Sequence, residues 1–170
     1  MDFKNKWVLL FLGTFLLFVI EVLYFYPKLP DTVASHFNIE GNVDNYMNKN
    51  NFVLMIFGIY LAITIFFLIF AIKLPSMSTK HLNLPHKELL LDESHRKASL
   101  KRISIYFIKL SSLTNAFFIC LFLLTSYVSI KGLNKLPSVF FILLALYIIS
   151  MIVLFMGFNR DMRKLSEMDS

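Results

Sequence analysis

Four apolar stretches, each long enough to cross a lipid bilayer, constrain this chain more than any other feature of its sequence. They cover about residues 7–26, 52–72, 108–130 and 136–158. The hydrocarbon core of a bilayer is about 30 Å thick and an α-helix rises about 1.5 Å per residue, so roughly 20 apolar residues suffice to cross it. The chain is therefore expected to enter the membrane at each stretch.

The spans are expected to be helices of one membrane domain that covers residues 1–170. Hydrophobic residues make up 57% of the chain and charged residues only 16%, against about 25% charged residues in a typical soluble domain. Lipid offers the backbone no hydrogen-bond partner, which leaves helices or a closed barrel. Barrel strands alternate apolar and polar residues, whereas these stretches are apolar on every face. We predict an all-α, polytopic membrane protein with a bundle of four transmembrane helices.

The connections between the spans differ in length and in expected side of the membrane. Lys and Arg residues near spans are retained on the cytoplasmic side. With both termini cytoplasmic, that side holds 12 of the 17 cations and the other side four. The 12 are Lys4, Lys6, Lys73, Lys80, Lys87, Arg96, Lys97, Lys101, Arg102, Arg160, Arg163 and Lys164. This orientation gives an external loop at residues 27–51, a cytoplasmic loop at 73–107 and a tight external turn at 131–137.

Charge and motif content argue against several function classes. The net charge of +6 fits membrane topology and attraction to anionic lipid. It does not indicate nucleic-acid binding, because the cations form no stripe interleaved with aromatic residues. The sequence has no Gly-rich phosphate loop, no Gly-x-Ser-x-Gly turn and no paired catalytic carboxylates. We therefore predict a protein that is not an enzyme and uses no cofactor, with the lipid bilayer as its first partner.

The external loop carries the most distinctive residues of the chain. Pro27 and Pro30 keep the backbone extended where it leaves the membrane. Further along, Asn38, Gly41 and Asn42 are residues that favour turns. The loop is therefore predicted to be structured.

Part of this loop resembles a segment shared by the SdpI bacteriocin-immunity proteins and their bacterial relatives. The matching residues are Leu29, Pro30, Val33, His36, Phe37, Asn38, Gly41, Asp44, Tyr46 and Lys49. Ala34 and Asn48 stand where Pro and Ser are common in that family. A looser likeness covers residues 83–88. The resemblance implies an integral protein of the bacterial plasma membrane that in some members protects against a toxic peptide and sequesters a regulatory protein, a repressor, at the membrane.

The loop is the candidate binding site, and three interpretations of it are open. The candidate ligand-binding residues are His36, Phe37, Asn38, Gly41, Asp44 and Tyr46. They could recognise a toxic peptide or an envelope ligand. His36 could instead bind a metal with Asp44 or Glu40, although zinc needs three or four converging ligands. In a purely structural role, His36 and Asn38 would hydrogen-bond the loop backbone and seat Phe37 on the helix ends.

The cytoplasmic loop offers a second possible metal site and a possible docking surface for a regulatory protein. His81, His86 and His95 lie near Glu88 and Glu93 in the sequence, but Pro85 interrupts any helical register and no His-Glu-x-x-His motif occurs. We predict no metal site. The alternative function is a small membrane metalloenzyme that uses His36 or these histidines. Residues 88–102 are charged and compatible with a helix that extends the third span.

Polar residues inside the spans form the last group of candidates. Glu21 and Asn115 lie within apolar stretches, and Ser111, Ser112 and Thr114 make a polar stripe with Asn115. Charge in hydrocarbon is costly, which makes such residues functional candidates. Hydrogen bonding between helices is one explanation. A proton or ion path through Glu21 and Asn115, in a transporter or channel subunit, is the other.

Overall fold

The computed structural model describes residues 5–76 and 93–167. Within these ranges it contains four helices that are long and apolar enough to cross a membrane. They are α1 (Lys6–Phe25), α2 (Lys49–Lys73), α4 (Glu93–Lys131) and α5 (Val139–Glu167). Two short 3₁₀ helices, η1 (Tyr26–Lys28) and η2 (Leu74–Ser76), follow α1 and α2. The predicted fold class is confirmed, with the addition of a small sheet of two strands, β1 (Thr32–Phe37) and β2 (Val43–Asn48).

Local sequence signals account for where several helices begin and end. The side chain of Asn5 accepts a hydrogen bond from the Trp7 amide at 3.0 Å, and Asn48 does the same for Asn50 at 2.9 Å. Both are N-caps, because they satisfy amides that have no partner within the helix. Gly132, with φ of +61°, ends α4 in the left-handed conformation that glycine adopts at low cost. The predicted extension of the third span is confirmed from Glu93 onward.

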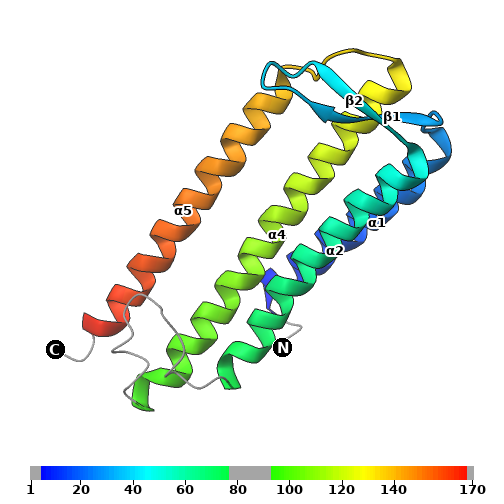
Figure 1. Cartoon of the computed structure of the whole chain (residues 1–170). Helices are drawn as coiled ribbons and strands as arrows, with labels where there is room; N and C mark the ends of the chain where they lie inside the picture. The colour runs from blue at the N-terminus through cyan, green and yellow to red at the C-terminus, as the bar shows by residue number, and fades with distance from the viewer. Residues whose placement is uncertain (1–4, 77–92, 168–170) are drawn as a thin grey trace.

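The helices form an elongated bundle with distinct ends (Figure 1). Both termini lie at one end, which we call the terminal end. The β-hairpin and the connection between α4 and α5 lie at the other, which we call the hairpin end. Helix α4 packs against α1, α2 and α5. The bundle is therefore organised around α4, the longest helix.

The core at the hairpin end is aromatic and joins three helices to the hairpin. Phe18 of α1 lies with its ring centroid 4.0 Å from that of Tyr60 of α2 and 5.8 Å from that of Phe122 of α4. Leu29, which precedes the hairpin, and Val33 of β1 are buried in the same cluster. The hairpin is thus part of the folded core and not an appendage to it.

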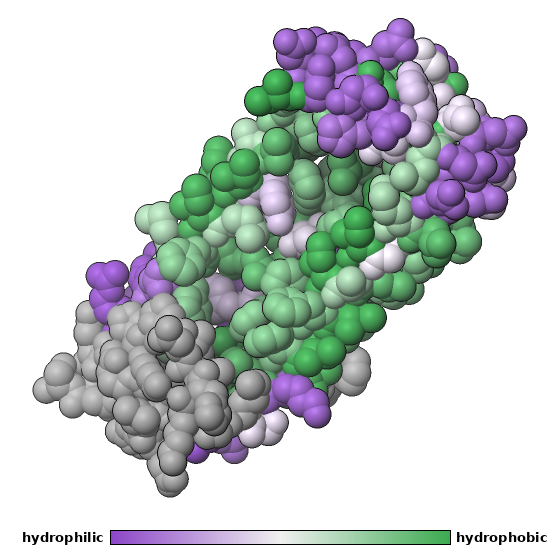
Figure 2. All heavy atoms as spheres, in the orientation of Figure 1, coloured by the Kyte–Doolittle hydropathy of each residue, from purple (hydrophilic) through white to green (hydrophobic). Residues whose placement is uncertain are grey.

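The surface has the pattern that lipid requires. Figure 2 shows an apolar band along the helices and polar residues gathered over the hairpin. Helix α5 is the extreme case, because no residue from Val139 to Asp161 is buried. Its exposed side chains include Ile142, Ile152 and Phe155. In water such a surface would favour aggregation, whereas in a bilayer these side chains contact acyl chains.

Candidate functional site

Within residues 27–51, predicted to be a structured loop, residues 32–48 fold as an antiparallel β-hairpin, whereas residues 27–28 belong to η1 and residues 49–51 to α2. The paired residues are Thr32 with Asn48, Val33 with Met47, Ala34 with Tyr46, His36 with Asn45 and Phe37 with Val43. The register is irregular on both sides of His36. The strands themselves were not predicted, although β-branched and aromatic residues on both sides of a turn containing Gly41 are a recognised hairpin signal.

The turn between the strands is built by the side chain of Asn38. Its Oδ1 accepts hydrogen bonds from the backbone amides of Glu40 at 3.0 Å and Asn42 at 2.9 Å. The Asn38 amide donates to the carbonyl oxygen of Asn42, also at 2.9 Å. The structural role predicted for Asn38 is therefore confirmed.

Backbone and side-chain contacts fix the hairpin to the end of the α4–α5 pair. The Leu136 amide donates to the Gly41 carbonyl at 2.8 Å, and the Val43 amide donates to the Asn134 carbonyl at 2.9 Å. Phe37 packs against a buried cluster of Ala34, Val128 and Leu136. Phe37 is thus seated on the helix ends, as the structural interpretation expected. The two backbone hydrogen bonds between the hairpin and the α4–α5 connection were not predicted.

Gly41 is required by its conformation and by its neighbour. Its φ is +83°, a region that other residues rarely adopt. A Cβ built at this position would lie 3.2 Å from Cζ of Phe141. This glycine allows the turn to lie close against the first turn of α5.

The structural interpretation expected the His36 side chain to hydrogen-bond the loop backbone. In the structure it bonds the side chain of Asp44 instead. Its Nδ1 lies 2.5 Å from Oδ1 of Asp44 on the opposite strand. The His36 side chain is 68% exposed and that of Asp44 42% exposed. Because both groups face water, they are available to a partner from outside.

The hairpin exposes several side chains, and we group five of them under the name hairpin surface. It consists of His36, Ile39, Glu40, Asp44 and Tyr46, all exposed. Ile39, at the tip, is 94% exposed and Tyr46 is 55% exposed. Residues 32–48 contain two acidic residues and no Lys or Arg. The hairpin surface therefore combines an apolar tip with two carboxylates, and Lys135, which pairs with Asn42 through the backbone, lies beside it.

No group of three or more His, Cys, Asp or Glu residues that could hold a metal occurs in the described part of the chain. His36 and Asp44 provide a pair. Of the candidates in the loop predicted to be cytoplasmic, His81, His86 and Glu88 lie outside the described residues, as do the side chains of Glu93 and His95. The same holds for the second family-like segment at 83–88.

The polar residues within the spans have different surroundings. Asn115, which is 1% exposed, accepts a hydrogen bond from Oγ1 of Thr64 of α2 at 3.0 Å. Thr114 and Tyr147 of α5 lie 3.3 Å apart through their hydroxyl oxygens. The predicted hydrogen bonding between helices is confirmed at these positions. Glu21 is also buried, and its Oε2 has no hydrogen-bond partner among the described residues.

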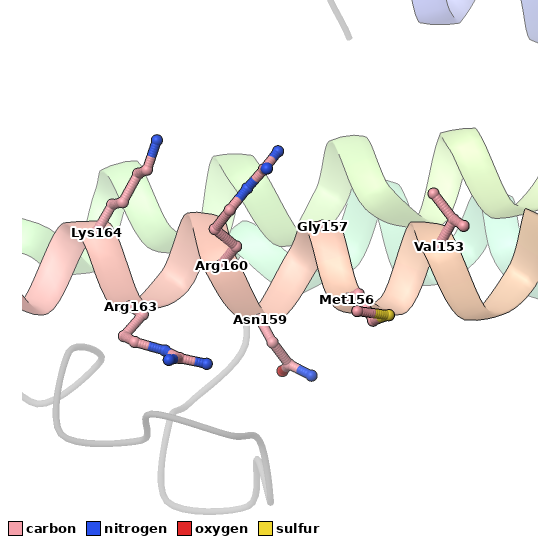
Figure 3. Close-up of a pocket in the computed structure, with 7 residues that line it drawn as sticks. All are labelled: Val153, Met156, Gly157, Asn159, Arg160, Arg163 and Lys164. Carbon is pink, nitrogen blue, oxygen red and sulfur yellow. The ribbon is translucent and has the colours of Figure 1, made fainter.

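A cavity of about 690 Å³ lies beside the C-terminal part of α5 (Figure 3). Arg160 and Lys164 project from one side of the helix, whereas Asn159 and Arg163 project from the other. These polar groups therefore do not converge on one point. The cations fit the predicted cytoplasmic position of this end but do not build a site.

One comparison with known proteins gave a match, and the match covers the hairpin and parts of the two helices beside it. Residues 12–61 match the model of a family described as a domain of unknown function, DUF1648. The match begins in α1, includes every candidate residue of the loop and ends in α2. It covers less than half of the chain. Comparisons with curated proteins and with solved structures found no match. The chain is thus a multi-pass membrane protein by its helices and is similar to DUF1648 over its hairpin unit.

Proposed function

We propose that this protein acts by binding, as an immunity or envelope-sensing factor of the bacterial plasma membrane. In this proposal the hairpin surface meets a toxic peptide or an envelope ligand outside the cell. The resemblance to the SdpI immunity proteins supports the choice of ligand class. A regulatory protein at the cytoplasmic loop, residues 73–107, is the second contact that the resemblance suggests.

The observation that carries the proposal is a docked hairpin with an exposed apolar tip. Hydrogen bonds from Leu136 and Val43 hold the turn in place, so binding would cost little ordering of the loop. Ile39 nevertheless points its side chain into the surroundings, with 94% of its surface exposed. Tyr46 is also exposed on this fixed, polar element, and tyrosine is enriched among the residues that contribute most to binding.

The charge of the hairpin surface favours one chemistry of ligand. Glu40 and Asp44 are close to Ile39 and Tyr46 in the sequence, and residues 32–48 contain no Lys or Arg. The nearby cation Lys135 belongs to the α4–α5 connection, where it pairs with Asn42. A peptide with basic and apolar side chains would complement such a surface in charge and in hydrophobicity. Many membrane-active toxic peptides have that composition.

The test is a challenge of bacteria that express the protein with a panel of cationic amphipathic peptides. We expect expression to raise the inhibitory concentration of at least one peptide. Ile39→Ser and Tyr46→Ala should then lower it again, because each removes an exposed apolar side chain without disturbing the core and without changing the charge. Protein levels are measured by immunoblotting of the membrane fraction.

Two further variants make the result specific to the hairpin surface. Lys101→Gln alters an exposed residue of α4 near the terminal end and should leave protection unchanged. Asn38→Ala is unsuitable as a binding probe, because its side chain builds the turn. The proposed role of the hairpin would be refuted if Ile39→Ser and Tyr46→Ala protected as well as the unchanged protein.

A further inference from the structure

A cleft opens between α1 and α5, across the face of α4, toward the terminal end of the bundle. It consists of two cavities that share Trp7 and Lys109 as lining residues. The cavity nearer the terminal end has a volume of about 360 Å³. The deeper one, of about 460 Å³, extends along the helices into the membrane span. We call the cavity nearer the terminal end the head compartment and the deeper one the tail compartment.

The head compartment is lined by cations and aromatic rings. Lys6, Arg102 and Lys109 come from α1 and α4, and Asp161 of α5 is the acidic residue among the lining residues described. Nζ of Lys109 lies 4.7 Å from the ring centroid of Trp7 and 4.2 Å from that of Tyr106. These rings hold the ammonium group at the mouth of the cleft.

Asp161 does not neutralise these cations by direct pairing. Its Oδ2 accepts a hydrogen bond from the Tyr106 hydroxyl at 2.8 Å, and its backbone carbonyl accepts one from Arg102 at 3.3 Å. Within the described residues, no ion pair within 4.0 Å joins Lys6, Arg102 or Lys109 to a carboxylate. The compartment therefore keeps an excess of positive charge that an anion can satisfy.

The wall of the tail compartment is mostly apolar. Apolar residues dominate its wall, namely Leu10, Leu113, Ala116, Ile149, Val153 and Leu154. Two of its hydroxyl groups are satisfied within their own helices, because Thr14 donates to the Leu10 carbonyl and Ser112 to the Ile108 carbonyl. A hydrocarbon chain could lie against the apolar part of this wall, and the hydroxyl groups of Thr14 and Ser112 would keep their hydrogen bonds.

We propose that this cleft binds one anionic phospholipid of the leaflet at the terminal end. The phosphate would sit among Lys6, Arg102 and Lys109, and one acyl chain would occupy the deeper cavity between α1 and α5. Basic pockets between transmembrane helices on the cytoplasmic side are suited to anionic headgroups, and that is the side predicted for this end. The lipid would fill the gap beside α5, whose span lacks buried residues.

The single tryptophan provides a direct test, because Trp7 lines both compartments. Bromine atoms on a lipid chain quench tryptophan fluorescence only at short range. The protein is reconstituted into phosphatidylcholine nanodiscs that contain a small fraction of brominated phosphatidylglycerol or, in parallel, brominated phosphatidylcholine. We expect the anionic lipid to quench Trp7 at a lower fraction than the neutral lipid, by about fivefold for each cation that contacts the phosphate.

Matched variants separate a built site from general attraction to a basic protein. Arg102→Gln and Lys109→Gln should each reduce the preference for the anionic lipid by about fivefold. Lys101→Gln removes the same charge from an exposed neighbour that does not line the cleft and should leave the preference intact. Lys109→Arg should also keep it.

Two results would overturn the proposal. One is equal quenching of the unchanged protein by both lipids. The other is an equal loss of preference in Lys101→Gln and Arg102→Gln, which would indicate attraction by net charge alone. The emission of Trp7 without brominated lipid verifies that its surroundings are unchanged in each variant. Arg102→Gln provides a second reading should Lys109→Gln shift that emission.

Discussion

At the residue scale, Gly41 controls whether the hairpin can reach its docking position. An alanine there would have to adopt φ near +83° with its Cβ 3.2 Å from Phe141. We expect Gly41→Ala to lower the free energy of unfolding by about 1–3 kcal/mol, the usual cost of strained backbone. The measurement is the midpoint temperature of thermal unfolding in detergent, which is monitored as the loss of monodisperse protein on heating.

The matched control for this change is Gly13→Ala in α1. Nothing lies within 4 Å of a Cβ built at Gly13, and alanine is favoured over glycine in helices. Its midpoint should equal or exceed that of the unchanged protein. A Gly41→Ala midpoint as high as that of Gly13→Ala would show that the turn tolerates a side chain.

A second prediction at this scale concerns the hydrogen bond between Thr64 and Asn115. A double-mutant cycle with Thr64→Val and Asn115→Leu should give a coupling energy of about 0.6 kcal/mol, the typical value inside membranes. Unfolding by a denaturing detergent measures it. Thr125, whose hydroxyl bonds the Leu121 carbonyl in its own helix, provides the control: Thr64→Val with Thr125→Val should be additive. Additivity in the first pair would mean that the bond contributes nothing.

At the scale of elements, the hairpin is held by a contact that only the fold creates. The Ala34 amide donates to Oγ of Ser129 on α4 at 3.1 Å. We expect Ser129→Ala to leave this amide without a partner, at a cost of about 1–3 kcal/mol where it is buried. Hydrogen exchange of the peptide that covers β1 should therefore become faster. Ser138→Ala, at an exposed position, should leave that rate unchanged, and equal rates in both variants would contradict the docking role of Ser129.

The same element shows which features the sequence could reveal. The helices were predictable because membrane thickness sets their length and each span is apolar in itself. The turn was also legible, since Asn38 and Gly41 favour turns locally. Ser129 and Phe141 carry no local signal, because their roles arise from contacts with residues about a hundred positions away in the chain. The cleft likewise depends on how three helices pack together.

At the scale of the whole molecule, the arrangement makes the two ends chemically different. The hairpin end presents a fixed polar surface with an apolar tip, and the polar residues over the hairpin are visible in Figure 2. The terminal end (Figure 1) holds the cations of α5 and those at the start of α4, from Arg96 to Arg102. Both proposals depend on this difference between the two ends, because a ligand is bound at the hairpin end and an anionic lipid at the terminal end. The side of the membrane on which each end lies is therefore the property to test.

Labelling of single cysteines in intact cells tests that orientation. The starting variant is Cys120→Ala, because Cys120 is the chain's one cysteine and lies within α4. A cysteine at Ile39, the most exposed apolar position of the hairpin, should react with a maleimide that does not cross membranes. One at Lys101 should react only after the cells are permeabilised, because cations flanking spans are retained inside. The reverse pattern would place the hairpin in the cytoplasm, where no external peptide could reach it, and would move the lipid cleft to the outer leaflet.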